Sequence, residues 1–301
     1  MRFFIIILLC SINLNAFGQD TLALSKQVFE QNNYTQTIIL LDEYTKHHNN
    51  DSAAFELCGD AYFEMNLYTN AAHNFSKAIA IVKSNGLLQK KRALALFLNG
   101  DYKASLYDWE FVCRKLPNDK NNWYYLGITQ QQTTNYNQAI VSLTEAIKLD
   151  SVFVEALQAR ANLFLKTQQY QLALYDIDSA LKITQFIEQQ FINRGLALLG
   201  LKKYKDAEQM FERVIKRNEK NVHAWFGLGN AYQNSYNYAK AIDAYDVCVA
   251  LRPDFELAYF KRGLSKLEIN KAEQGCEDIM QSLKLGYTDA MVYLKKFCNK
   301  G

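Results

Sequence analysis

Acidic side chains recur four residues apart in one segment of this chain, a spacing that places them on one face of a helix. Glu56, Asp60 and Glu64 stand at i, i+4 and i+8. Three carboxylates on one face could hold a cation, but an ordinary solvated helix face explains them more simply. We define these three residues as the acidic set.

A second set of residues combines amides with aromatic rings on successive segments. Asn and Gln carry both hydrogen-bond donors and acceptors, so a column of them can bond the backbone of an extended peptide while rings cover its apolar side chains. The alternative is that these residues are only the polar surface of a helical protein. The candidate binding residues are Tyr124, Gln131, Gln158, Asn162, Gln189, Asn193, Phe226, Asn230, Gln233 and Phe260.

The sequence lacks the usual patterns of catalysis and cofactor binding. It contains no HExxH or paired CxxC metal spacing, and the glycines at 195 and 200 are not followed by the Lys-Ser/Thr of a phosphate loop. We therefore predict no catalytic residue, no metal and no cofactor. The 34 basic and 31 acidic residues leave a formal net charge of +3 spread along the chain, which argues against a nucleic-acid partner.

A period of 34 residues defines the elements that must position these side chains. Tyrosine recurs at this spacing through seven successive units, and Ala272 takes the equivalent place in an eighth. We call these seven residues the anchor tyrosines. They are Tyr34, Tyr68, Tyr102, Tyr136, Tyr170, Tyr204 and Tyr238.

Two further columns of residues follow the same period. Nine residues before each anchor the side chain is always small: Ser25, Gly59, Ala93, Gly127, Ala161, Gly195, Gly229 and Gly263. Seven residues after each anchor it is large: Leu41, Phe75, Trp109, Leu143, Ile177, Phe211, Tyr245 and Ile279. We expect the small and large side chains to interlock where the two helices of a unit cross.

These motifs resemble the tetratricopeptide repeat. The family signature is matched by Trp225, Leu228, Gly229 and Tyr232, followed by Ala241, Tyr245 and Pro253. The resemblance covers about residues 18–289. It implies an all-α fold, a superhelical solenoid of about eight 34-residue helix-turn-helix repeats, in which the first helices line a concave groove.

The register divides residues 19–289 into eight repeats and leaves 290–301 as a C-terminal capping helix. The chain has only 2 Pro and 13 Gly, and no Pro-, Gly- or Ser-rich linker interrupts it, so we expect one continuous body. The repeats cover about 18–51, 52–85, 86–119, 120–153, 154–187, 188–221, 222–255 and 256–289.

Residues 1–18 have the pattern of a secretory signal peptide. Arg2 precedes an apolar run from Phe3 to Ile12, and Ala16 and Gly18 are the small residues that a signal peptidase requires. We predict cleavage after Gly18, export to the periplasm, and no membrane insertion of the mature chain. An uncleaved anchor, or a lipoprotein modified at Cys10, remains as an alternative.

The C-terminal segment from Gly275 to Cys298 resembles the closing module of exported repeat proteins from Bacteroidetes-type bacteria. We expect the capping helix to fold back on repeat eight, where a disulfide would join Cys276 and Cys298, since export permits such bonds. The alternative is that both thiols are merely packed in the cap. Cys58, Cys113 and Cys248 fall at or beside packing positions, where free cysteine behaves as a small hydrophobe.

Together these features predict a scaffold without enzymatic activity that binds a protein or extended peptide in the groove of the first helices. The alternative is a self-assembling structural component of an envelope complex that uses its convex or terminal faces. The oligomeric state and the identity of the partner stay open.

Overall fold

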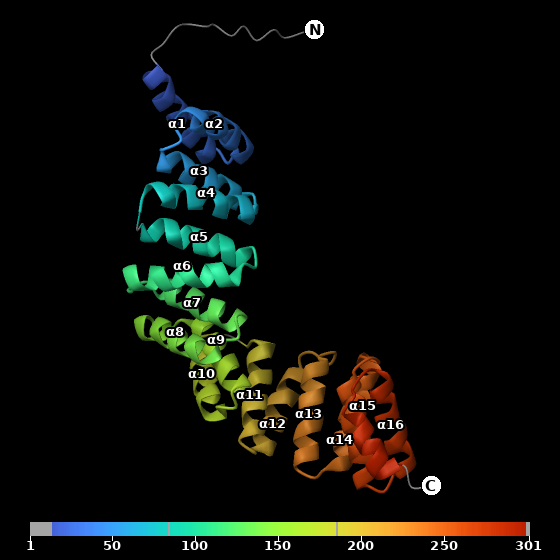
Figure 1. The fold of residues 1–301 in the computed structure, drawn as a ribbon. Coiled ribbons are helices and arrows are strands. Elements are labelled where there is room, and N and C mark those ends of the chain that lie inside the picture. The colour runs from blue at the N-terminus through green and yellow to red at the C-terminus, as the bar shows by residue number, and fades with distance from the viewer. Residues whose placement is uncertain (1–13, 84, 185, 299–301) are drawn as a thin grey trace. The chain divides into compact units, whose positions relative to one another are not determined.

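The computed structural model describes residues 14–83, 85–184 and 186–298, and every element within them is helical (Figure 1). The helices form two compact units, which meet in sequence between Asp150 and Ser151. This differs from the single body that we expected. In a solenoid each repeat contacts only its neighbours, so no common core obliges all the repeats to form one unit.

Unit 1 contains four helical hairpins that pack in chain order (Figure 1). Its first helices are α1 (Leu14–Glu30), α3 (Ser52–Glu64), α5 (Gly86–Leu98) and α7 (Lys120–Gln132). Its second helices are α2 (Tyr34–His47), α4 (Tyr68–Ile81), α6 (Tyr102–Lys115) and α8 (Tyr136–Leu149). The predicted signal peptide, apart from the start of α1, lies outside the described residues.

Unit 2 contains four more hairpins and a short C-terminal cap. Its first helices are α9 (Val154–Lys166), α11 (Glu188–Gly200), α13 (Val222–Asn234) and α15 (Glu256–Glu268). Its second helices are α10 (Tyr170–Ile183), α12 (Tyr204–Ile215), α14 (Tyr238–Leu251) and α16 (Ala272–Lys284). The cap consists of α17 (Ala290–Tyr293), which continues as a π-helical turn over Leu294–Cys298.

Each anchor tyrosine is the first residue of a second helix, and Ala272 begins the eighth. The turn before each second helix is also the same throughout. The residue two positions before the anchor always has a positive φ, from 59° at Asn32 to 86° at Gly100. Only glycine adopts this left-handed region without a steric cost, yet Gly100 is the only glycine at these eight positions. The tyrosine register therefore marks both the turn and the helix start.

The predicted interlocking of small and large side chains is confirmed. A Cβ added to Gly229 would lie 2.5 Å from the ring of Tyr245, and one added to Gly195 would lie 2.6 Å from the ring of Phe211. The same relation holds in unit 1, where the Cβ of residue 59 would lie 2.6 Å from Phe75. Real Cβ atoms do not approach so closely, so the hairpins can close only where the first helix carries a small residue.

Candidate functional site

All ten candidate binding residues lie on first helices, as the register requires. Tyr124 and Gln131 are on α7 of unit 1. The other candidates are in unit 2: Gln158 and Asn162 on α9, Gln189 and Asn193 on α11, Phe226, Asn230 and Gln233 on α13, and Phe260 on α15. Their surroundings divide them into those that face solvent and those that the fold itself uses.

Three of the amides in unit 2 form a connected chain across two repeats. Gln189 Nε2 donates to Asn193 Oδ1 at 2.8 Å, and Asn193 Nδ2 donates to Asn162 Oδ1 at 2.6 Å. Asn162 and Gln189 are exposed, and Asn193 is half-buried. We call these three residues the amide chain. These hydrogen bonds hold the three side chains in fixed positions on adjacent first helices. At the two exposed ends of the chain, Gln189 presents its amide oxygen as an acceptor and Asn162 presents its amide nitrogen as a donor.

Asn230 and Gln233 are engaged within the fold, which corrects the expectation that packing leaves them free. The hydroxyl of Tyr245 donates to Asn230 Oδ1 at 2.8 Å and lies 3.4 Å from Gln233 Oε1. Gln233 Nε2 donates to Ser265 Oγ of the next repeat at 3.0 Å. These two amides are engaged because position 245 is a tyrosine, whose hydroxyl reaches the first helix of its hairpin. Phe75 and Phe211, at the equivalent position of other repeats, have no polar atom to offer.

Phe260 is also wrong as a groove residue, because its side chain is only 4% exposed. It packs in a cluster with Ile279 and with Ala290 and Leu294 of the cap. Its ring centroid lies 4.8 Å from that of Tyr287. The cap folds over this part of α15, so the ring belongs to the core. Phe226 is half-buried, with its ring centroid 4.8 Å from that of Phe255.

The acidic set is largely neutralised by the neighbouring repeat. Lys91 Nζ lies 2.6 Å from Glu56 Oε1 and 2.7 Å from Asp60 Oδ2. Burial raises the pKa of Asp60, and the ion pair with Lys91 opposes that rise. Glu64 is exposed at the end of α3. Within the described residues no cluster of three His, Cys, Asp or Glu side chains could hold a metal ion.

A buried ion pair that was not predicted from the sequence recurs in three hairpins. Arg92 and Asp108, Arg160 and Asp176, and Arg262 and Asp278 each form a two-point contact between the helices of one hairpin. Each arginine stands ten residues before its anchor position and each aspartate six after. Where the first position is instead Leu or Cys, the second carries no charge. Reading these two columns together would have revealed the pairing.

The cap carries a disulfide between Cys276 of α16 and Cys298. Their Cα atoms are 5.7 Å apart, inside the limit of about 7 Å for such a bond. The other described cysteines, Cys58, Cys113 and Cys248, are free and buried. Burial raises the pKa of each of these three thiols to about 12, so they stay protonated and unreactive at neutral pH.

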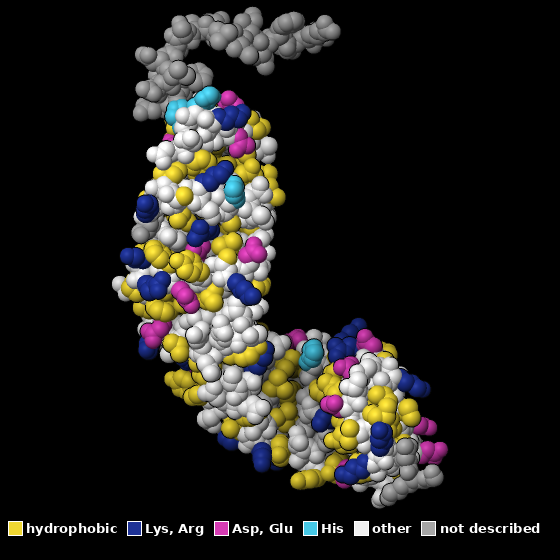
Figure 2. Space-filling view, viewed as in Figure 1, with side chains coloured by type: hydrophobic (Ala, Val, Ile, Leu, Met, Phe, Trp, Pro, Cys, Tyr) yellow, Lys and Arg dark blue, Asp and Glu magenta, His cyan; other side chains and the backbone are white. Residues whose placement is uncertain are grey.

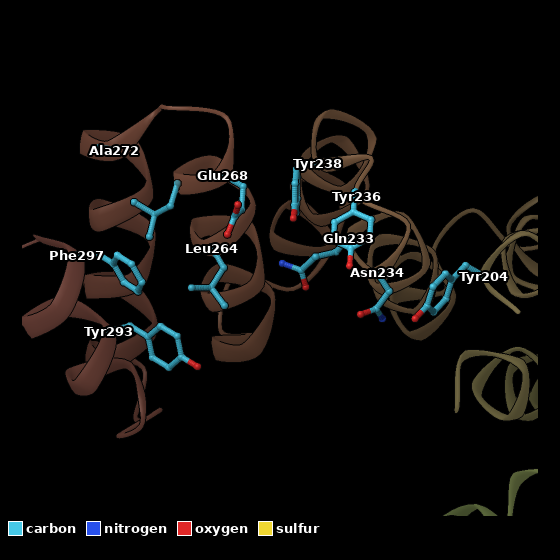
Figure 3. Close-up of a pocket in the computed structure, with 11 residues that line it drawn as sticks. Tyr204, Gln233, Asn234, Tyr236, Tyr238, Leu264, Glu268, Ala272, Tyr293 and Phe297 are labelled. Carbon is cyan, nitrogen blue, oxygen red and sulfur yellow. The ribbon is translucent and has the colours of Figure 1, made fainter. Parts of the chain in front are cut away.

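A cavity of about 680 Å³ opens in unit 2 at the edge formed by the turns between first and second helices (Figure 3). We call it the end pocket. It is lined by Tyr204, Gln233, Asn234, Tyr236, Tyr238, Leu264, Leu267, Glu268, Ala272, Tyr293 and Phe297. Gln233 is its only member among the candidate binding residues. The pocket was missed because Tyr293 and Phe297 belong to the cap, which lies outside the 34-residue register.

Two rings and one carboxylate give the end pocket its chemical character. The rings of Tyr236 and Tyr238 stand at 79° to each other with centroids 6.3 Å apart, so they form a corner. Glu268 of α15 lies beside Tyr238 in Figure 3. Desolvation, and then the charge of Glu268, raise the pKa of the Tyr238 hydroxyl. Among the described residues that line the pocket, Glu268 alone is charged at neutral pH.

Figure 2 shows hydrophobic, basic and acidic side chains interspersed on the visible face of each unit. No helix among the described residues is long and apolar enough to cross a lipid bilayer.

Comparison with known proteins gives the same repeat. Residues 192–254 match the tetratricopeptide repeat family. Among curated relatives, Superkiller protein 3 of Schizosaccharomyces pombe is 24% identical over 255 residues, covering 79% of this chain. The chain spans only 18% of that protein's length, and 27% of the Anaphase-promoting complex subunit 3 of the same organism.

Solved structures show the fold over more of the chain. A tetratricopeptide repeat protein from Parabacteroides merdae superposes with a TM-score of 0.62 at 15% identity, covering 82% of this chain and 99% of its own. The C-terminal part of a repeat protein from Cytophaga hutchinsonii superposes with a TM-score of 0.62 at 16% identity. The match covers 77% of this chain and 96% of that one. YrrB, described as a TPR protein with an unusual peptide-binding site, superposes with a TM-score of 0.50 at 17% identity. The match covers 62% of this chain and 97% of YrrB.

Likeness at this level of identity establishes the fold and not the ligand. The predicted all-α solenoid of helical hairpins is confirmed, and its hairpins carry one register of anchor, small and large residues. Proteins built in this way generally mediate interactions between proteins. Residues 192–254 match the tetratricopeptide repeat family, and hairpins of the same register run through both units of the chain.

Proposed function

We propose that this protein is an exported scaffold without enzymatic activity, which binds an extended segment of a partner protein along the first helices. The observation that carries the proposal is the amide chain of Gln189, Asn193 and Asn162. Its three side chains are fixed by one another on two adjacent helices, which lowers the entropy cost of presenting them to a ligand. A peptide backbone offers the donors and acceptors that they need.

The place of action is part of the same proposal. The secretory pattern of residues 1–18 supports export, and the disulfide in the cap suits an oxidising compartment such as the periplasm. Two similar structures come from Parabacteroides merdae and Cytophaga hutchinsonii, which agrees with a Bacteroidetes-type source. Mass spectrometry of the protein from the native envelope tests the export step. We expect a mature chain that begins at Gln19, and retention of Met1 would contradict it.

The binding step is tested on a partner captured by crosslinking in the native envelope. Replacing Asn162, Asn193 and Gln189 by alanine should weaken binding by about 0.5–1.5 kcal/mol for each hydrogen bond lost. Asn230 is left unchanged because it accepts a hydrogen bond from the hydroxyl of the buried Tyr245. The matched control replaces Gln171 and Gln209, two exposed amides on second helices. Normal binding by the triple variant would place the ligand elsewhere.

A self-assembling component is the second candidate, and a row of exposed apolar side chains favours it. Ile39, Tyr107 and Val141 stand five residues after their anchors on second helices of unit 1, and they are 56%, 69% and 61% exposed. An apolar row of this kind can bury itself against another copy. Light scattering coupled to size exclusion separates the candidates. A stable oligomer that Tyr107→Ser and Val141→Ser dissolve would favour assembly, and a monomer would exclude it.

A further inference from the structure

The end pocket has the features of a cation site that no basic side chain of the described residues occupies. The corner of Tyr236 and Tyr238 presents two aromatic faces at nearly a right angle. Ring faces attract cations, and pairs of rings at such angles bind ammonium and guanidinium groups. Glu268 adds a full negative charge beside Tyr238 (Figure 3).

The basic side chains nearest to Glu268 on α15 are already engaged with other acids. Arg262 bonds Asp278 and Asp246, and the Lys266 ammonium lies 2.8 Å from Asp278. Among the described residues no ion pair of Glu268 is formed. By contrast, the carboxylates of Glu56 and Asp60 are covered by Lys91. Glu268 is thus an exposed carboxylate beside two rings, and its charge is left for a ligand.

The other side of the end pocket is apolar. Leu264 and the cap residues Tyr293 and Phe297 gather there in Figure 3. Phe297 already has the Lys296 ammonium 4.9 Å from its ring centroid. A second cation is therefore unfavourable at Phe297, and the Glu268 side is where a positive group of the ligand fits. The two sides of the pocket would therefore suit a ligand in which an apolar side chain stands next to a cationic one.

We propose that the end pocket binds a lysine or arginine side chain of a partner peptide between the tyrosine corner and Glu268, with a neighbouring apolar side chain against Leu264 and Tyr293. The assignment rests on the proposed scaffold function and adds to it a preference for a basic segment. Charge complementarity selects this ligand, because the described lining residues include one negatively charged side chain and no positively charged one. A neutral sugar could stack on the rings, but it would gain nothing from the carboxylate.

The test uses the mature full-length protein and two short acetylated peptides, Ala-Leu-Lys-Leu-Ala and its counterpart with Gln in place of Lys, in ligand-observed NMR titrations. The unmodified protein should bind the Lys peptide about three- to tenfold more tightly than the Gln peptide. Glu268→Gln should abolish that preference. Tyr236→Asn should reduce it, and asparagine tolerates the positive φ of 62° at this position.

Glu219→Gln is the matched control, because it removes an exposed glutamate of the same unit that does not line the end pocket. This variant should keep the preference for Lys. Equal binding of the two peptides, no binding of either, or a preference that survives Glu268→Gln would overturn the assignment. So would tighter binding of a neutral N-acetylglucosamine trimer whose affinity Glu268→Gln leaves unchanged. The amide-chain variants test the scaffold separately, since none of their residues lines the end pocket.

Discussion

Gly229 shows how much one residue of the register contributes. It is buried on α13, and its Cα faces the ring of Tyr245 so closely that even a methyl group would overlap the ring. We expect Gly229→Leu to lower the free energy of unfolding by about 1–3 kcal/mol, the usual cost of overpacking a core. Thermal or denaturant unfolding measures the change.

Gly86 provides the matched control for this prediction. A Cβ at this position would lie 3.4 Å from Leu116, an ordinary contact, and alanine favours the helix over glycine. Gly86→Ala should therefore leave the free energy of unfolding unchanged or raise it. An unchanged midpoint in Gly229→Leu would mean that the two helices of this hairpin do not cross at residue 229.

The interlocking columns of the register and the disulfide of the cap were predicted, whereas contacts peculiar to single repeats were not. The anchor tyrosines gave the period of the repeats, and the structure shows that each of them is the first residue of a second helix. The burial of Phe260 depends instead on the cap, whose Ala290 and Leu294 have no counterpart in the other repeats. The ion pairs of Lys91 depend on the rotation between neighbouring repeats, which a one-dimensional period does not encode.

The helix pair α9 and α10 is joined by one of the buried ion pairs. Arg160 Nε and Nη2 donate to the two oxygens of Asp176 at 2.8 and 2.7 Å, and the aspartate side chain is 1% exposed. Arg160→Leu would leave that carboxylate buried without its cation, so we expect a loss of about 3–5 kcal/mol in the free energy of unfolding.

The double variant Arg160→Leu with Asp176→Ala reproduces the pair that the next-but-one repeat uses, Leu228 and Ala244. It should recover most of the loss, since no unpaired charge remains. Urea unfolding of both single variants and the double variant gives the coupling energy. Additive losses in the double variant would show that the two side chains do not stabilise each other.

The cap is the second element whose stability can be measured directly. The disulfide between Cys276 and Cys298 closes a loop over a sequence separation of 22 residues. Such a crosslink contributes about 2–4 kcal/mol in the chain-entropy model. We expect Cys276→Ser with Cys298→Ser to lower the melting temperature and to increase hydrogen exchange in the cap.

Peptide mapping without reductant checks the bond itself. Cys276 and Cys298 should appear in one linked peptide pair, whereas Cys58, Cys113 and Cys248 should be recovered as free thiols that resist alkylation until the protein unfolds. Recovery of Cys276 and Cys298 as free thiols from periplasmic protein would refute the disulfide. The cap would then be held only by its packing, chiefly that of Ala290, Tyr293 and Leu294.

At the scale of the molecule, the two compact units predict that residues 151–301 fold by themselves. This unit contains its own hairpins, two buried Arg–Asp pairs and the cap. Circular dichroism of the isolated fragment should show a helical spectrum and a cooperative melt. A shorter fragment that ends at Gly286 loses the cover over Phe260 and Ile279, so it should melt at a lower temperature. A largely unfolded 151–301 fragment would contradict the division.

The short reach of the contacts has a consequence for synthesis. Each Arg–Asp pair within a hairpin spans 16 residues, and the bond from Lys91 to Glu56 spans 35. During synthesis, each hairpin can therefore make all these contacts once little more than one further repeat has emerged. Contacts that are this close in sequence also form quickly. We expect the repeats to be completed one after another behind the ribosome or the export pore. Cys298 follows all eight hairpins, so oxidation of the cap would report that the eighth repeat has emerged and folded.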